Sequence, residues 1–202
     1  MRPCKFLECP DFPCLDINRS RYVIPDVEID PEKIRAIMIS EAPPQEASDY
    51  FYAQKNPVYM QTTVQAFKDA GFNVSSMKDV LDLGVYITTA IKCAKTTYAI
   101  APETIDNCSL RILEKEIDLF PEAKIILLMG DTAIKAMNYI AKRNLGKRII
   151  PGGSTYKIRK NEYVYEQFRV FPSYLQTGKS YMIEKSKQKM IAEDIKLALK
   201  HY

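Results

Sequence analysis

The sequence predicts an α/β protein, a three-layer α/β/α sandwich around a mostly parallel, four-stranded central sheet. Short, continuously apolar runs near residues 34–40, 85–91 and 124–129 are typical of strands that are buried on both faces. Segments with apolar residues at helical spacing separate these runs, and strands that alternate with helices favour a parallel sheet. The 202 residues are expected to form a single domain, 1–202, with a loop-rich lead-in over residues 1–30.

The remaining elements follow from spacing and from residues that end helices. Helices are expected at 60–70, 75–83, 102–120 and 131–143, the second of them short. Residues 156–159 and 163–171 are expected to form a hairpin whose second arm is the last strand of the sheet. From residue 180 onwards one amphipathic helix is expected, with Ile183, Ile191 and Ile195 among its inward residues.

Composition narrows the class of protein. No apolar run approaches the ~20 residues that span a bilayer, and the first residues lack the apolar core of a secretory signal. We therefore expect a cytoplasmic protein with no membrane partner. The net charge of +4 is compatible with a polyanionic partner without requiring one.

The segment Ser40-Glu41-Ala42-Pro43-Pro44 follows the first predicted strand directly. The prolines end the strand because they donate no N–H and restrict the residue before them. This places Glu41 at the carboxyl end of a parallel strand, where open α/β sheets bind their ligands. Glu41 is therefore the first candidate for a functional carboxylate.

Five cysteines suggest a metal site. Cys4, Cys9 and Cys14 lie among prolines in the lead-in, and Cys93 and Cys108 follow later. Disulfides are disfavoured in the cytoplasm, and four gathered thiolates bind an iron–sulfur cluster or zinc. A buried cysteine also serves simply as a small apolar residue, so spacing alone leaves both interpretations open.

Aromatic residues gather in the predicted loop after Glu41, at Tyr50, Phe51, Tyr52 and Tyr59. They either pack on the core or line a pocket for a flat ligand by stacking. The residues alone do not decide between these two interpretations.

Several motifs occur in the order found in the uracil-DNA glycosylase superfamily, and the chain most resembles its iron–sulfur-containing branch. The matching segments are Ser40-Glu41-Ala42-Pro43-Pro44, Tyr86-Ile87-Thr88-Thr89-Ala90-Ile91-Lys92-Cys93, Leu128-Met129-Gly130-Asp131-Thr132-Ala133 and Phe171-Pro172-Ser173, with Cys108 after Cys93. The resemblance runs from about residue 9 to about residue 200 and implies the uracil-DNA glycosylase fold.

The resemblance implies an enzyme that flips a damaged base out of DNA and hydrolyses its N-glycosidic bond. Glu41 would orient the attacking water or stabilise the positive charge that develops on the sugar. Base binding would fall to Ala42, Tyr59 and Thr89. Contact with DNA would come from the segment around the last motif, namely Phe171, Pro172, Ser173, Tyr174 and Lys179.

The resemblance also implies a four-iron, four-sulfur cluster held by Cys9, Cys14, Cys93 and Cys108. The spacing in the lead-in departs from that of the family, so Cys4 stays an alternative to Cys9, and zinc an alternative to the cluster. The cluster's expected role is structural, because it would tie the lead-in to the segment between Cys93 and Cys108.

Two departures affect the expected specificity. Thr89 stands where the family reads the base with asparagine, and a hydroxyl cannot make the paired bonds of an amide. Phe171 stands where the family has a histidine, and its ring donates no hydrogen bond. Two hypotheses follow: a monomeric DNA glycosylase of altered specificity, or an inactive relative that binds nucleic acid or a nucleotide through the same cleft.

Overall fold

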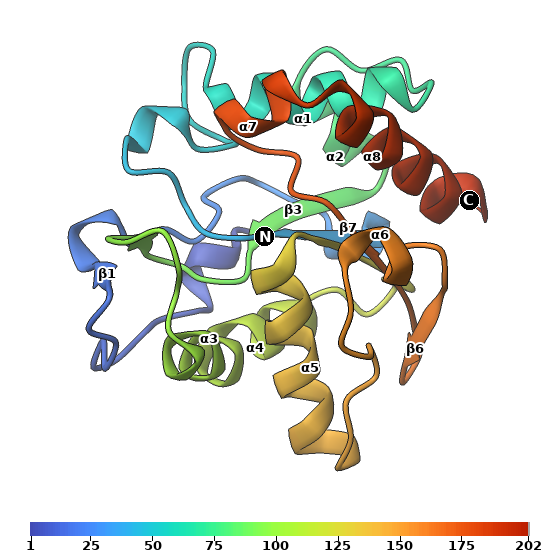
Figure 1. Cartoon of the computed structure of the whole chain (residues 1–202). Helices are drawn as coiled ribbons and strands as arrows, with labels where there is room; N and C mark the ends of the chain where they lie inside the picture. The colour runs from blue at the N-terminus through green and yellow to red at the C-terminus, as the bar shows by residue number, and fades with distance from the viewer. Residues whose placement is uncertain (202) are drawn as a thin grey trace.

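The computed structural model describes residues 1–201, except for the side chains of Lys179, Ser180 and His201. The chain folds into three layers, with a central sheet between two sets of helices (Figure 1). This is the predicted α/β/α sandwich. No helix within the described range is long and apolar enough to cross a membrane.

The central sheet has five strands in the order β3-β2-β5-β7-β6. The first four are parallel, and β6 pairs antiparallel with β7 at the edge. Residues Ile39 and Leu128 are register partners in the central pair, which fixes the relative height of the two strand ends. The bounds are β2 Ala36–Ser40, β3 Val85–Thr89, β5 Ile125–Met129, β6 Tyr163–Tyr165 and β7 Phe168–Ser173.

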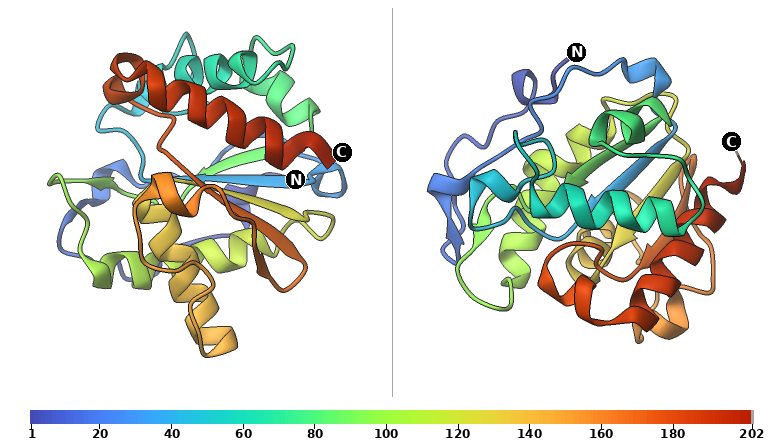
Figure 2. Two further views of the ribbon diagram at one scale, coloured as in Figure 1. Left: turned by 45° about the vertical axis from the view of Figure 1, so that its right-hand side comes forward. Right: turned by 90° about the horizontal axis from the view of Figure 1, so that it is seen from above.

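One helical layer covers each face of the sheet. Figure 2 shows α1 and α8 side by side on one face, where they are also in contact. This layer contains α1 Val58–Asp69, α2 Met77–Asp82, α7 Lys179–Ile183 and α8 Lys185–Ala198. The opposite layer contains α3 Pro102–Cys108, the π-helical turn η5 Ser109–Leu113, α4 Glu114–Ile117 and α5 Asp131–Leu145.

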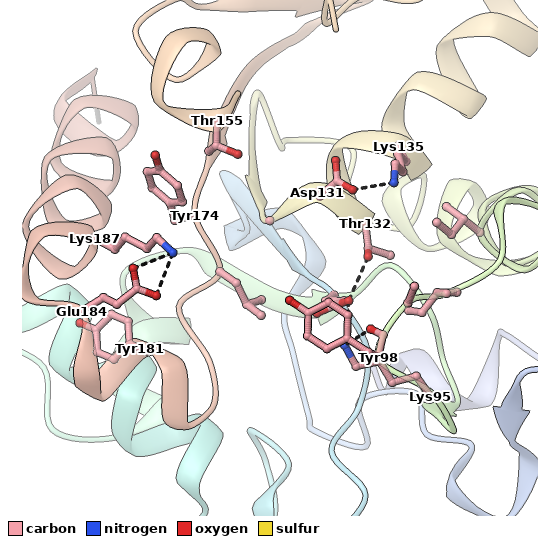
Figure 3. Close-up of a pocket in the computed structure, with 16 residues that line it drawn as sticks. Lys95, Tyr98, Asp131, Thr132, Lys135, Thr155, Tyr174, Tyr181, Glu184 and Lys187 are labelled. Carbon is pink, nitrogen blue, oxygen red and sulfur yellow. Dashed lines mark hydrogen bonds and ion pairs between the residues drawn. The ribbon is translucent and has the colours of Figure 1, made fainter. Parts of the chain in front are cut away.

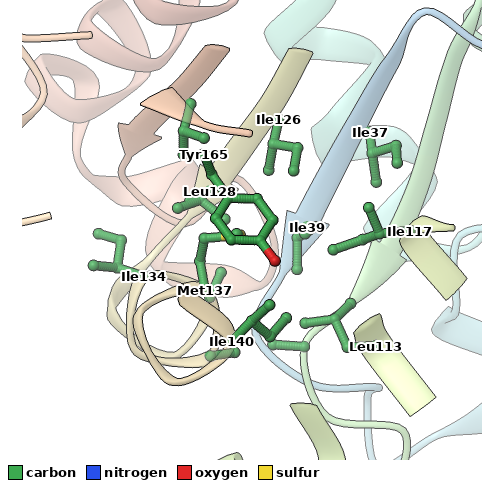
Figure 4. Close-up of a cluster of buried hydrophobic side chains, with 14 of the residues drawn as sticks. Ile37, Ile39, Leu113, Ile117, Ile126, Leu128, Ile134, Met137, Ile140 and Tyr165 are labelled. Atoms are coloured by element: carbon green, nitrogen blue, oxygen red, sulfur yellow. The ribbon is translucent and has the colours of Figure 1, made fainter. Parts of the chain in front are cut away.

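Apolar residues from alternate strand positions fill both interfaces. On the α5 side, Ile39 of β2 and Leu128 of β5 pack towards Met137 and Ile140 (Figure 4). On the α1 and α8 side, Met38 belongs to a second buried cluster, which side chains from the opposite face of the sheet form with residues of these helices. Every residue of β2, β3 and β5 is buried, which is why these strands read as continuous apolar runs.

The lead-in is attached to the domain by main-chain hydrogen bonds. β1 (Ile17–Asn18) pairs antiparallel with β4 (Ala94–Lys95), forming a separate two-stranded sheet. The amide of Val23 donates to the carbonyl of Lys92 at 2.8 Å. These bonds place the cysteine-containing start of the chain beside the segment that follows β3.

The structure corrects four expectations. The sheet has five strands, because Tyr163–Tyr165 forms its own antiparallel strand, and the expected arm at 156–159 is instead mostly helix α6 (Thr155–Ile158). The expected helix over 102–120 is divided by a π-helical turn after Cys108. The C-terminal helix is divided at Glu184, whose non-helical ψ of 81° leaves Ile183 77% exposed instead of inward.

Candidate active site

Glu41 lies at the carboxyl edge of the sheet because its main chain continues the β2–β3 ladder. The amide of Ala90 donates to the carbonyl of Ser40 at 2.8 Å, and that of Ile91 to the carbonyl of Glu41 at 3.0 Å. The following residue, Ala42, is buried. The backbone of Glu41 is therefore fixed while its side chain, 22% exposed, faces a cavity.

Two donors hold one oxygen of this carboxylate. Glu41 Oε1 accepts from Lys95 Nζ at 3.1 Å and from Thr132 Oγ1 at 3.2 Å. Lys95 comes from β4, and Thr132 comes from the first turn of α5 (Figure 3). No hydrogen bond within residues 1–201 engages Oε2, so the second oxygen stays available to a ligand.

The cavity around Glu41 has a volume of about 480 Å³. Lys95, Tyr98 and Thr132 form one wall, and Tyr174 and Lys187 lie on the opposite side (Figure 3). Such a volume is within the ~300–1,000 Å³ typical of ligand sites. The cavity can therefore hold a group as large as a nucleoside.

Charges inside the cavity are paired. Lys95 pairs with Glu41 at 3.1 Å, Lys135 with Asp131 at 2.6 Å and Lys187 with Glu184 at 2.8 Å. The cavity is thus lined by three ion pairs, and of these three acids only Glu41 follows a strand of the central sheet directly.

Gly130 brings the β7 loop close to the start of α5. Its φ of +99° lies in the region that glycine favours, and an added Cβ would lie 3.3 Å from Leu175 Cβ. The Gly130 amide also donates to the Ser173 carbonyl at 3.0 Å. The sequence motif Gly130-Asp131-Thr132 therefore positions both the cavity wall and the Thr132 hydroxyl.

The predicted base-binding residues lie behind the Glu41 loop and do not line this cavity. The Tyr59 hydroxyl donates to the Ala42 carbonyl at 3.5 Å, and burial raises the pKa of Tyr59 to about 12 although a hydrogen bond with Thr177 opposes the shift. Thr89 is fully buried, and its hydroxyl has no hydrogen-bond partner within the described residues. The Tyr50 hydroxyl is also buried and unpartnered there.

The aromatic residues of the loop differ in what surrounds them. Phe51 is 1% exposed and belongs to the core. Tyr50 and Tyr52 line a second cavity, of about 270 Å³, between the lead-in and this loop. The Tyr52 hydroxyl also donates to the carbonyl and accepts from the amide of Ile87, which satisfies these groups at the edge of the sheet.

The predicted DNA-contact segment is mostly buried. Phe171 is 3% exposed in the core between the sheet and α8, and Ser173 donates to the buried carboxylate of Asp194. Pro172 is also buried. Tyr174 is the residue of this set that lines the Glu41 cavity, and the side chain of Lys179 lies outside the described residues.

Four cysteines from distant parts of the sequence line one narrow cavity. They are Cys9, Cys14, Cys93 and Cys108. Burial, with the neighbouring thiolates of the other three, raises the pKa of Cys93 to about 12. Cys4 does not line this cavity, and its Sγ donates to Asp26 Oδ1 at 3.3 Å.

The donor set is compatible with the ligand pattern of an iron–sulfur cluster. Within the described part of the chain, no three His, Cys, Asp or Glu side chains are grouped so as to hold one metal ion. In a four-iron cluster each of four cysteines binds its own iron, so the four sulfurs need not meet at one point. The four thiols around one cavity fit such a group in identity and number.

Several cavity residues were missed by sequence reasoning, among them Lys95, Thr132, Tyr98 and Leu175. Lys95 and Glu41 are 54 residues apart, and Thr132 and Glu41 are 91 apart. The local sequence around Lys95 contains no signal for this contact. For Thr132, the Gly-Asp-Thr turn after a predicted strand was the available signal.

Comparisons with known proteins identify the family of the chain. The family model of the uracil DNA glycosylase superfamily matches residues 27–196, so the chain belongs to that superfamily. A Type-5 uracil-DNA glycosylase from Thermus thermophilus is 30% identical over 98 residues, which cover 48% of this chain and 43% of that relative. The alignment thus spans less than half the length of the relative.

Proposed function

We propose that this protein is a DNA glycosylase that hydrolyses the N-glycosidic bond of a deaminated, uracil-type base. The observation that carries the proposal is the placement of Glu41: a carboxylate at the carboxyl end of β2, facing a cavity, with Oε1 held by Lys95 and Thr132. Membership of the uracil DNA glycosylase superfamily supports it. The substrate is DNA, from which the target nucleotide must be flipped to reach the cavity.

The carboxylate suits the charge changes of this reaction. As the base departs, positive charge develops on the sugar, and a fixed negative group beside it lowers the barrier. Glu41 Oε2, which the hydrogen bonds to Oε1 leave free, can either face this charge or orient the attacking water. Fixing Oε1 with two donors means that little reorganisation is needed during the reaction.

The departing base must be recognised without the family's asparagine and histidine. Thr89 and Phe171 occupy those positions and are buried away from the cavity. This supports a specificity that differs from strict uracil recognition. Tyr98 and Tyr174, which line opposite sides of the cavity, offer aromatic faces on which a base can stack.

The test measures base release from oligonucleotides that contain uracil, hypoxanthine or xanthine. Glu41→Gln keeps the size of the side chain and removes its charge, so we expect a loss of about 10²-fold or more in rate. Glu46→Gln is the matched control, because Glu46 is exposed in the same loop and does not line the cavity. Absence of base release from every substrate at stoichiometric protein would contradict the proposal.

A second candidate function is binding of nucleic acid without cleavage. Thr89 and Phe171 stand at the positions of the family's asparagine and histidine. The observation that favours this function is that both are buried and neither lines the cavity, so neither replaces the family's base contacts. This function predicts salt-dependent binding of DNA that is unchanged in Glu41→Gln, with no base released. The same oligonucleotides, used in a binding assay, distinguish the two functions.

We further propose that Cys9, Cys14, Cys93 and Cys108 hold a four-iron, four-sulfur cluster with a structural role. The shared cavity of these four thiols supports this assignment. Two of them come from the lead-in and two from the segment around α3, so the cluster would supply a covalent tie between these parts of the chain. Iron and sulfide analysis of protein purified without oxygen tests the assignment, and zinc in their place would contradict it.

A further inference from the structure

Lys95 presents a primary amine directly beside the proposed catalytic carboxylate. Its Nζ lies 3.1 Å from Glu41 Oε1, and the side chain is 31% exposed. The other two lysines that line the cavity pair with Asp131 and Glu184 instead. Lys95 is therefore the one amine in the described cavity wall that touches Glu41.

The position of this amine is fixed by the surrounding backbone. Lys95 is the register partner of Ile17 in the small sheet, and the Gln45 side chain donates to its carbonyl. Its Nζ also donates to the Tyr98 carbonyl at 3.1 Å and lies 5.5 Å from the Tyr98 ring centroid. Amine and carboxylate are thus presented together to whatever occupies the cavity.

The product of base release is a group with which a primary amine reacts. Hydrolysis of an N-glycosidic bond leaves a sugar whose C1′ is a hemiacetal in equilibrium with an aldehyde. Primary amines condense with aldehydes to form imines, which is how catalytic lysines capture carbonyl substrates. If Glu41 acts near C1′, as the proposed function requires, then Lys95 Nζ is also near C1′.

We propose that Lys95 forms an imine with the C1′ aldehyde of an abasic site and thereby gives the protein an abasic-site lyase activity. This inference rests on the proposed function for the placement of C1′. Nζ attacks C1′ after passing a proton to Glu41. Glu41 returns this proton to the carbinolamine hydroxyl, which leaves as water, so that the C=N bond forms as a protonated imine and Glu41 is again a carboxylate. The proposed ligand is therefore the abasic sugar in DNA.

Strand cleavage follows from the imine without any oxidant or reductant. A base, for which Glu41 is in position, removes a proton from C2′. The electron pair forms a C2′–C3′ double bond and the C3′–O bond breaks, so the 3′ phosphate leaves with its negative charge. Water then hydrolyses the imine, which returns the free amine of Lys95 and releases an unsaturated aldehyde on the DNA end.

The alternative is that Lys95 only holds Glu41 in place and neutralises its charge. Both interpretations predict that loss of Lys95 impairs base release, so that measurement cannot separate them. Covalent capture can, because only imine formation links the chain to DNA.

The experiment mixes the full chain with an oligonucleotide that already contains an abasic site, in the presence of borohydride. Borohydride reduces an imine to a stable amine, so we expect a protein–DNA complex on a denaturing gel, with Lys95 as the modified residue by peptide mass analysis. Lys95→Arg keeps the positive charge beside Glu41 but forms no such imine, and it should lose the complex. Lys142→Gln, which removes an exposed lysine of α5 that does not line the cavity, should keep it.

Three results would overturn the proposal: no trapped complex with wild-type protein that binds the oligonucleotide, an undiminished complex in Lys95→Arg, or a modified residue other than Lys95. A trapped complex without strand cleavage in the absence of borohydride would overturn the elimination step. The oligonucleotide already contains the abasic site, so the trapping experiment does not depend on base release. A protein that releases no base would refute the proposed function, while formation of the trapped complex would still test the role of Lys95.

Discussion

The ammonium of Lys92 and the carboxylate of Glu116 form an ion pair in which each side chain is 1% exposed. Glu116 Oε1 also accepts from the hydroxyls of Tyr86 at 2.7 Å and Thr88 at 2.9 Å. Lys92 Nζ donates to Thr88 Oγ1 at 2.7 Å as well. The network joins β3 to α4 between the Glu41 edge of the sheet and the cysteine cavity.

Removing one partner of this pair should strongly destabilise the fold. Glu116→Ala leaves the Lys92 ammonium buried without its counter-charge, so we expect a loss of about 3–5 kcal/mol in the free energy of unfolding. Urea unfolding followed by circular dichroism measures it. The double variant Lys92→Met/Glu116→Leu should recover much of the loss, and a loss near zero in Glu116→Ala would contradict the assignment.

A second buried pair anchors the end of β7 to α8. Asp194 accepts from Arg159 Nε at 2.9 Å and from the Ser173 hydroxyl, and its side chain is 5% exposed. Asp194→Ala should cost about 3–5 kcal/mol in unfolding free energy, because Arg159 then loses its buried counter-charge and keeps only the exposed Glu193 as an ion-pair partner. Glu193→Ala is the control: Glu193 contacts the same guanidinium at 3.1 Å but is 53% exposed, so we expect about 0–1 kcal/mol. Equal losses in both variants would contradict this account.

Gly130→Ala tests the close approach between the β7 loop and α5. The positive φ of Gly130 costs an alanine about 1–3 kcal/mol, and the new methyl would crowd Leu175. We expect a lower thermal midpoint together with reduced base release, because Thr132 lies in the first turn of the helix that follows. Gly152→Ala meets no atom within 4 Å and requires no positive φ, so it should leave the midpoint nearly unchanged.

The four cysteines of the shared cavity should differ from the fifth in metal content. Cys93→Ala and Cys108→Ala should lose most of their iron, whereas Cys4→Ala should retain it because Cys4 faces Asp26 instead. Iron per polypeptide, measured after anaerobic purification, reports the difference. Equal iron in Cys4→Ala and Cys93→Ala, at any level above zero, would refute the ligand set.

Acid should weaken α2 through Asp79. Hydrogen bonds from the hydroxyl and amide of Ser75, followed by those of Ser76, lower the pKa of Asp79 from 3.8 to about 2. Since the folded pKa lies below the unfolded one, the stabilisation is complete above pH 3.8 and is lost as pH falls towards about 2. Stability measured across this range should fall less steeply in Asp79→Asn. An unchanged pH profile in that variant would show that Asp79 does not contribute.

The sequence by itself determined the layers of the fold and the position of Glu41. Both depend on local patterns: strands buried on both faces read as apolar runs, and two prolines end the first of them directly after the glutamate. The edge strand Tyr163–Tyr165 escaped prediction because it is short, and one of its three residues, Val164, is 62% exposed, so its apolar pattern is weak.

Only the tertiary structure decided what surrounds Glu41. Lys95 and Thr132 reach it from 54 and 91 residues away, and the burial of Thr89 and Phe171 depends on which face of its strand each side chain occupies. That Cys9 lines the shared cavity and Cys4 does not is also a result of the tertiary structure. Contacts across such separations depend on strand order and register, which no local period of hydrophobic residues specifies.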